Sequence, residues 1–254
     1  MFIKCKINLR DLLNFYSFFI LRFFITQLAL HVALTSLFSS EIKNLTIRKD
    51  RTSGNVIFTK CVYICGPMTP THPLIRRVKE LEQYFKKIVK NQKYPAEIQN
   101  LCTFENIEFI RCYSVNEVLE NLKNIDFQNK RLIVVDRVAD FFTGQDENVK
   151  VSKIGLDKLI LSQKLLEIAR CHDLAVVVLN NVSDVFDDTP IHKITQFEKD
   201  IGYRACLGAR WADCLTGGRY YFLKNESTGT REIVDTKGNR IGIRIKESGI
   251  SIAK

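Results

Sequence analysis

The chain has 254 residues, of which 46% are hydrophobic and 26% are charged, so it is long and apolar enough to bury a real core and is not intrinsically disordered. Lysine and arginine outnumber aspartate and glutamate by 38 to 28, and the net charge of +10 favours polyanionic partners such as nucleic acid or an acidic membrane surface. Plain solubility explains the charge equally well. The eight cysteines are scattered without the spacing of a zinc site, which is typical of a reduced intracellular protein.

The first element in the chain is an apolar run over residues 12–38 that follows a positively charged start, as in a signal peptide or membrane anchor. Polar residues interrupt it before the ~20 consecutive apolar residues that a membrane span needs. Gln27, His31 and Thr35 recur at every fourth position, which predicts a half-buried helix with one polar face. A membrane-anchored protein that uses residues 12–38 stays open as an alternative.

Apolar strands and amphipathic helices alternate through the middle of the chain. Strands are expected at 55–65, 107–113, 130–136 and 174–181, and helices at 74–90, 114–122 and 156–170. Ser114 and Glu117 form a predicted capping box at the start of the second of these helices. Because the strands at 131–136 and 174–180 are apolar on both faces and a helix of crossover length joins them, we expect them to be adjacent in a parallel sheet that is covered on both faces.

From residue 219 the pattern changes to alternating strands, "RYYFLK", "TREIVD" and "RIGIRI", separated by the glycine-containing turns "NESTG" and "TKGN". The sequence therefore predicts an α/β fold in which a mostly parallel central sheet has helices on both faces and an antiparallel C-terminal hairpin extension.

In such a sheet, ligands bind beyond the carboxyl ends of the strands. Asp136 ends the strand "LIVVD", where P-loop NTPases keep the carboxylate that holds magnesium. Asn180 and Asn181 end "LAVVVLNN", where an amide can contact a terminal phosphate. Each of these residues alone is more often a turn former, so the pattern is weak without a wider match.

The segments "VYICGPMTPTHPLIRRV", "RLIVVDRVADFF", "LAVVVLNNVSD" and "LGARWADCLTGGRYYFLK", in that order, resemble the ATPase core of RecA-like recombinases, in particular the eukaryotic paralogs that assist the strand-exchange recombinase. The resemblance runs from Thr26 to the C-terminus, and Leu207–Trp211 is its most specific part. It implies a RecA-like P-loop NTPase core over residues 25–254. Residues 1–24 do not match, and we interpret them as an aberrant N-terminal segment, from read-through of non-coding sequence or an alternative first exon.

The resemblance implies that "ITQLALHVAL" is the helix that follows the phosphate loop. Thr26, Gln27, Asp136 and Asn181 then occupy nucleotide-binding positions, and Thr26 and Asp136 occupy the magnesium-binding positions. The family uses ATP and Mg²⁺, but Ile25 stands where its lysine belongs and no glycine precedes it. We therefore expect that this chain does not bind ATP usefully.

The acidic residue that the family has after its "YIxT" strand is also missing, because residues 66–68 are Gly-Pro-Met. No catalytic residue is assigned, and enzymatic activity is left open. An alternative is an active DNA-dependent ATPase whose phosphate loop is lost only in the gene model.

The resemblance further implies a nuclear protein of homologous recombination that binds single-stranded or branched DNA and sister paralogs, with no membrane. In the family, DNA is contacted by the loops after the strands that end at Asp136 and Asn181. These loops are expected at residues 143–153 and 187–204. The candidate DNA-binding residues are Lys150, Lys153, Lys193, Lys199 and Arg204.

Overall fold

The structure is a computed structural model that describes the greater part of the chain from residue 60 onward and short pieces before it. The described residues are 2–4, 29–30, 32–33, 48–49, 56–57, 60–69, 71–91, 104–142, 151–184, 195–208, 211, 218–224, 231–246 and 249–252. Thr26, Gln27, Lys150, Lys193 and all but three residues of the 1–24 segment lie outside them, so the predictions for these positions stay predictions.

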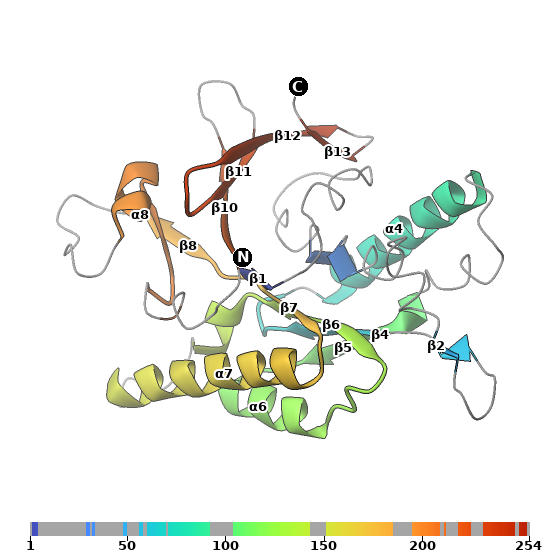
Figure 1. The fold of residues 1–254 in the computed structure, drawn as a ribbon, viewed down its shortest axis with the longest axis horizontal. Coiled ribbons are helices and arrows are strands. Elements are labelled where there is room, and N and C mark those ends of the chain that lie inside the picture. Colours follow the sequence, from blue (N-terminus) through green and yellow to red (C-terminus); the bar gives the residue numbers. More distant parts are fainter. Residues whose placement is uncertain are drawn as a thin grey trace.

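Nine strands form the main sheet. Their bounds are β1 Phe2–Lys4, β4 Lys60–Cys65, β5 Ile107–Arg111, β6 Lys130–Asp136, β7 Ala175–Val178, β10 Gly218–Lys224, β11 Arg231–Asp235, β12 Arg240–Lys246 and β13 Gly249–Ile252. Their order in the sheet is β13-β12-β11-β10-β1-β7-β6-β4-β5 (Figure 1). Two small antiparallel pairs stand apart, β2 Arg48–Lys49 with β3 Val56–Ile57, and β8 Val182–Asp184 with β9 Tyr203–Ala205.

Strands β7, β6, β4 and β5 are parallel, as expected. β6 pairs with β7 from Leu132 opposite Ala175 to Val135 opposite Val178, which confirms that these two strands are adjacent. Every residue of β6 from Leu132 onward is buried, because helices cover both faces of this part of the sheet.

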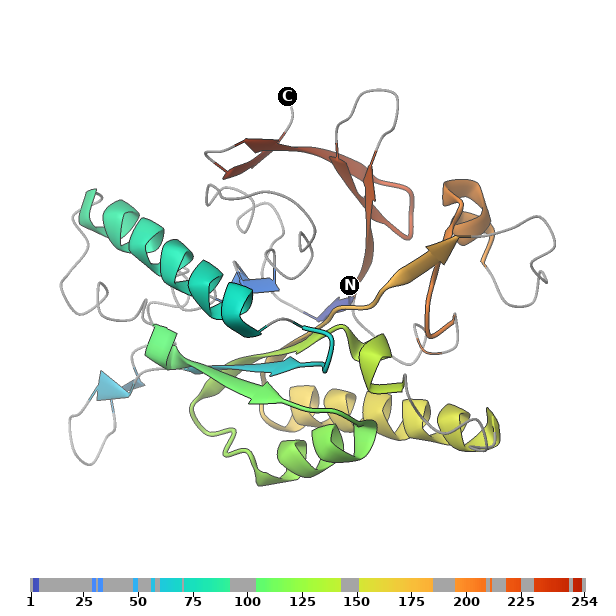
Figure 2. The same ribbon diagram turned by 180° about the vertical axis from the view of Figure 1, so that it is seen from behind.

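The helices are α4 Thr71–Asn91, α6 Val115–Asn124, α7 Val151–Cys171 and α8 Gln196–Ile201, with 3-10 turns η1 Phe104–Asn106 and η2 Val138–Phe142. α4 covers one face of the sheet, and α6 and α7 lie side by side on the other (Figures 1 and 2). Under α4 the core includes Leu74, Val78 and Leu81, packed with Tyr63 and Val134 of the sheet.

Helical residues Ala29, Leu30, Val32 and Ala33 belong to the same core cluster as α4 and are at most 2% exposed. They are part of the segment that the sequence predicts to be a half-buried helix, and the structure confirms that these four residues are helical and buried. Within the part of the chain that the structure describes, no helix is both long and apolar enough to cross a membrane.

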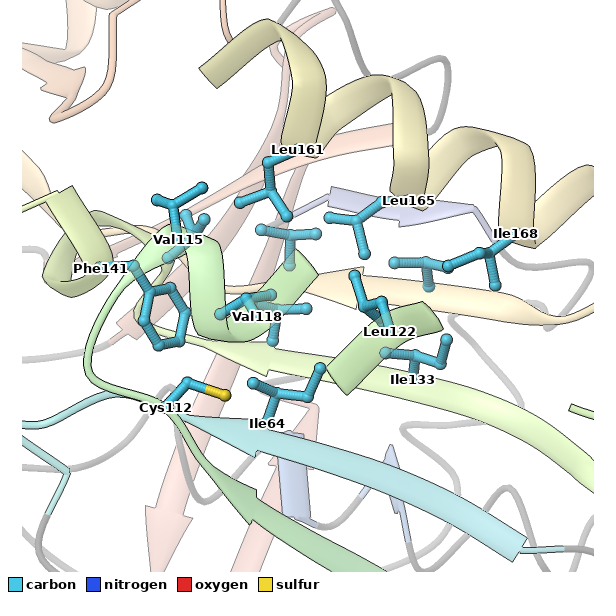
Figure 3. Packing of buried hydrophobic residues seen from close by; sticks show 14 of the residues in the cluster. Ile64, Cys112, Val115, Val118, Leu122, Ile133, Phe141, Leu161, Leu165 and Ile168 are labelled. Carbon is cyan, nitrogen blue, oxygen red and sulfur yellow. The ribbon is translucent and has the colours of Figure 1, made fainter. Parts of the chain in front are cut away.

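The opposite face of the sheet packs against α6 and α7. Leu161, Leu165 and Ile168 of α7 recur at helical spacing and meet Ile133 of β6 and Leu122 of α6 (Figure 3). This double cover makes the parallel part of the sheet a three-layer structure.

The C-terminal strands are antiparallel, as predicted, and β1 joins them to the parallel part because it pairs with both β7 and β10. The predicted "TKGN" turn is confirmed: the Asp235 carboxylate accepts hydrogen bonds of 2.9 Å from the backbone N–H groups of Lys237 and Asn239. Gly238 takes a φ of 83° there, which glycine adopts without strain. β12 also pairs with a fourth antiparallel strand, β13, which was not predicted.

Two local predictions need correction. α7 begins at Val151 rather than near residue 156, so the last residues of the expected 143–153 loop are helical. The capping box of α6 is half formed: the Ser114 hydroxyl accepts a bond from the N–H of Glu117, but the Glu117 carboxylate accepts from the N–H of Tyr113 at 2.9 Å rather than from that of Ser114.

Candidate functional site

The carboxyl ends of β7, β6, β4 and β5 meet at one edge of the sheet. Asp136, the last residue of β6, pairs in register with Cys65, the last residue of β4. Its carboxylate is fully buried, and the Oη of Tyr63 donates a hydrogen bond of 2.8 Å to its Oδ2. Burial raises the pKa of Tyr63 well above its ordinary value, and the neighbouring Asp136 carboxylate acts in the same direction, so the phenol stays a donor.

Tyr63, the hydrogen-bond partner of Asp136, belongs to the core cluster that also holds Ala29 and Leu30. Asp136 therefore lies on the face of the sheet against which the helical residues Ala29 and Leu30 pack. The assignment of Asp136 to nucleotide and magnesium binding stays a prediction.

The two asparagines after β7 differ in environment. Asn180 is 7% exposed, and neither atom of its side-chain amide has a hydrogen-bond partner among the described residues. Asn181, the residue assigned to nucleotide binding, is exposed, and its backbone carbonyl accepts a bond of 3.0 Å from the N–H of Cys206. This bond holds the start of the Leu-Gly-x-x-Trp segment beside β7, while Leu207 and Trp211 are buried among the residues under α7.

The turn after β4 stands where the family keeps its acidic residue. Arg111 of β5 fixes this turn, because its Nη2 donates to the carbonyls of Pro67 at 2.8 Å and Thr69 at 3.0 Å. Met68 is 69% exposed and no side chain of residues 66–68 can accept a proton. The side chain of Arg111, on the neighbouring strand β5, thus places a guanidinium next to this turn.

Asp140 of η2 places a carboxylate beside that turn, which the sequence alone did not reveal. A Cβ atom built on Gly66 would lie 3.0 Å from the Cβ and 3.4 Å from the Oδ2 of Asp140. Arg137, which has a left-handed φ of 61°, pairs its Nε with Asp140 Oδ2 at 3.1 Å. Burial raises the pKa of Asp140, and Arg137 opposes the shift.

As a metal site this edge is incomplete within the described residues. Asp136 is the one assigned magnesium ligand that is described, and one of its oxygens already accepts from Tyr63. No three histidine, cysteine or acidic side chains of the described residues are grouped closely enough to hold a metal ion.

The three described DNA-binding candidates do not lie together on one element. Lys153 is exposed in the first turns of α7, Lys199 is exposed on α8, and Arg204 is half-buried on β9. In the described part of the second expected loop, residues 196–201 form α8 and residues 203–204 belong to β9. Of the described candidates, only Lys199 and Arg204 belong to the same substructure, which consists of α8 and β9.

A buried glutamate fixes α8 to the main sheet. Glu198 is fully buried and completes a capping box with Thr195, whose N–H donates to its Oε2 at 3.0 Å. Its Oε1 accepts from the Tyr221 hydroxyl of β10 at 2.9 Å and from the Ala205 N–H at 3.2 Å. The signal for this helix was present in the sequence as Thr-Gln-Phe-Glu, the Ser/Thr-x-x-Glu pattern of a helix start.

No protein-family model matches the sequence, and no curated protein matches it. Among solved structures, the crystal structure of the RadB recombinase is similar to this chain with a TM-score of 0.53 and 16% sequence identity. The match covers 90% of this chain and 85% of the other. The chain therefore has the fold of a RecA-like recombinase, as the sequence predicted.

Proposed function

We propose that this chain is a recombinase paralog of homologous-recombination repair, which acts in the nucleus, binds DNA and sister paralogs, and carries a degenerate ATP site. The observation that supports the proposal is its likeness to the RadB recombinase over 90% of the chain. Within that fold, the motif residues Asp136 and Asn181 stand at the carboxyl ends of parallel strands, where open α/β sheets bind ligands. The motifs are most similar to those of the third X-ray repair cross-complementing protein.

The ATP site is degenerate for two reasons. Ile25 stands at the position of the phosphate-loop lysine, and the first glycine of the chain is Gly54, so no backbone nest precedes the helix. The turn at 66–68 has no acidic residue to polarise a water molecule. The family's cofactors, ATP and Mg²⁺, are accordingly not part of the proposed activity of this chain.

Lys199 and Arg204 are the described residues that support DNA binding best. Both belong to the α8–β9 substructure, which Glu198 ties to Tyr221 of β10. The sequence from residue 204 onward is also basic, with ten lysine or arginine residues against five acidic ones. Cationic side chains attract a phosphate backbone without reading its sequence.

The test is a titration of fluorescent single-stranded DNA at several salt concentrations. We expect weak binding that falls steeply with salt, because counterion release drives the contact. The charge reversals Lys193→Glu and Lys199→Glu together should weaken binding and lower the salt slope by about 1.4, at ~0.7 per lost phosphate contact. Lys123→Glu is the matched control, since Lys123 is exposed on α6, which lies well away from α8 (Figures 1 and 2).

Binding that does not depend on salt, or no binding at low salt, would contradict the DNA-binding role. The cellular part of the proposal is tested separately by imaging a tagged full-length chain. Nuclear fluorescence supports a repair protein, whereas fluorescence at membranes supports the alternative of an anchor in residues 12–38.

A further inference from the structure

The first half of α7 carries apolar side chains on its solvent side. Leu156 is 55% exposed, Leu159 42% and Ile160 41%, and they are three of the seven large hydrophobic residues that are exposed in the described part of the chain. This half of α7 extends past the end of α6, and no other helix among the described residues covers it (Figures 1 and 2).

Two of these side chains, Leu156 and Ile160, belong to a longer stripe with coiled-coil spacing. Lys153, Leu156, Ile160, Gln163 and Glu167 follow one another in steps of three and four residues, and all five are exposed. That is the a/d spacing of a heptad repeat, which places the five side chains in one line along the helix. The residues that pack onto the sheet, from Leu161 to Ala169, lie on the opposite side of the helix. We call this line of five residues the α7 stripe.

The charges of the α7 stripe are arranged symmetrically about its centre. Ile160 is the middle residue, Lys153 lies seven residues before it and Glu167 seven residues after it. At a rise of about 1.5 Å per residue, both charges are about 10.5 Å from Ile160 along the helix axis. A second α7 helix that runs antiparallel, with a two-fold axis near Ile160, would therefore bring each Lys153 opposite Glu167 of the other copy.

We infer that the α7 stripe is a self-association surface on which a second copy of this chain packs antiparallel, with the two Ile160 side chains at the centre. The arrangement is isologous, as in most two-fold dimers, and it buries Leu156 and Ile160 of both copies. Glu167 is 58% exposed and already pairs with Lys164 at 3.1 Å, so its carboxylate has room for a second cation.

Most of the stripe is poorly suited to DNA. Its centre is apolar, and its far end carries the acidic Glu167, which would repel a phosphate backbone. Lys153, at the other end, is also a DNA-binding candidate, so the variants that leave Lys153 unchanged distinguish the two roles. Because the stripe offers few apolar residues per copy, the dimer is weak and depends on protein concentration. The inference does not rest on the proposed function, since self-association and DNA binding are measured separately.

The test is sedimentation equilibrium of the full chain over a range of concentrations. Ile160→Asp should leave the protein monomeric, because two carboxylates would meet at the centre. Lys153→Glu and Glu167→Lys should each weaken the dimer by about tenfold, since both symmetry-related contacts turn from attraction to repulsion. The double variant Lys153→Glu/Glu167→Lys should restore dimerisation, because the opposite charges then face each other again.

Lys123→Glu on α6 is the matched charge-reversal control and should dimerise as the unaltered chain does. Circular dichroism and thermal unfolding of each variant verify the fold. A chain that stays monomeric at all concentrations, a dimer that Ile160→Asp does not disrupt, or a double variant as weak as the single ones would each overturn the inference. A Glu167→Lys variant that self-associates less but binds DNA at least as tightly as the unaltered chain separates loss of this surface from loss of the proposed function.

Discussion

The hydroxyl of Tyr63 donates a hydrogen bond of 2.8 Å to Oδ2 of Asp136, and both side chains are fully buried. The bond links β4 to β6 at the edge where the candidate site lies. A buried carboxylate needs such donors, because leaving it without a partner costs more free energy than the bond itself contributes. Tyr63 therefore stabilises Asp136, the one magnesium-ligand candidate among the described residues.

We predict that Tyr63→Phe lowers the free energy of unfolding by about 1–3 kcal/mol, since the ring still fills the core while Asp136 loses the hydrogen bond from the Tyr63 hydroxyl. Urea unfolding followed by circular dichroism measures the change. Tyr113→Phe is the matched control, because Tyr113 is 61% exposed, and it should change stability by less than about 0.5 kcal/mol. Equal stability of both variants would show that the Tyr63 bond contributes nothing.

A second prediction concerns the bond between Tyr221 and Glu198, which attaches α8 to the sheet. Burial raises the pKa of Tyr221 to about 12, above the value of about 10 expected in an unfolded chain. A group whose pKa is raised by folding stabilises the protein fully below about pH 10, and this contribution is lost as the pH rises through about 12. The folded state should therefore weaken over this alkaline range.

Tyr221→Phe should cost about 1–3 kcal/mol at neutral pH, where it removes a donor from the buried Glu198. It should also flatten the loss of stability between about pH 10 and 12. Because the pKa of Tyr63 is raised as well, some alkaline loss remains in this variant, and the difference between the two proteins is the quantity to compare. Parallel stability curves would rule out Tyr221 as the group that titrates.

The parallel sheet could be predicted from the sequence because its strands are apolar on both faces. Residues 132–135 and 176–178 are runs of leucine, isoleucine and valine that cannot face water, so burial predicts that both strands are central. The crossover helix between them predicts that they are adjacent. The start of α7 could not be found in this way. Val151 and Gly155 are poor helix formers, so the sequence before residue 156 is as compatible with a loop as with a helix.

The side chains around the candidate site depend on contacts between distant residues. The Thr-x-x-Glu pattern predicts the contact of Glu198 with Thr195, but it does not predict the contact with Tyr221, 23 residues further on, that accompanies the burial of Glu198. Asp140 reaches the turn at Gly66 because Arg137 reverses the backbone with a positive φ, which is uncommon outside glycine and asparagine. No pattern in the neighbouring sequence predicts either contact.

The close approach of Asp140 to Gly66 gives a third prediction. Gly66→Glu, which would restore an acidic residue after β4, should destabilise the protein by about 1–3 kcal/mol, because its Cβ would lie 3.0 Å from the Cβ of Asp140. The double variant Gly66→Glu/Asp140→Ala keeps this crowding and should stay destabilised, whereas Gly66→Glu/Asp140→Gly removes the opposing Cβ and should recover most of the stability. Thermal unfolding of the unaltered chain, the single variant and the two double variants distinguishes a steric cause from an electrostatic one. Recovery of stability with Asp140→Ala as well would point to charge repulsion.

The last prediction is that this chain does not bind ATP. A phosphate loop supplies several charge-assisted hydrogen bonds from backbone N–H groups and a lysine, each worth roughly 1.5–3 kcal/mol. The loss of three such bonds removes about 5–9 kcal/mol, which at ~1.4 kcal/mol per decade turns micromolar binding into undetectable binding. Asp136 alone cannot compensate, because magnesium would have no held phosphates to bridge.

Replacement of residues 1–25 by a segment that ends in Gly-x-x-x-x-Gly-Lys should restore nucleotide binding, because Ala29 and Leu30 already anchor the following helix on the face that carries Asp136 and its partner Tyr63. Turnover should stay slow, since the turn at Gly66 offers no base and the nearby Asp140 carboxylate is paired with Arg137. Calorimetric titration of both proteins with ATP and Mg²⁺ measures the change, and alanine in place of the restored lysine is the matched control. Tight ATP binding by the unaltered chain would contradict the assignment of Thr26 to a broken phosphate loop.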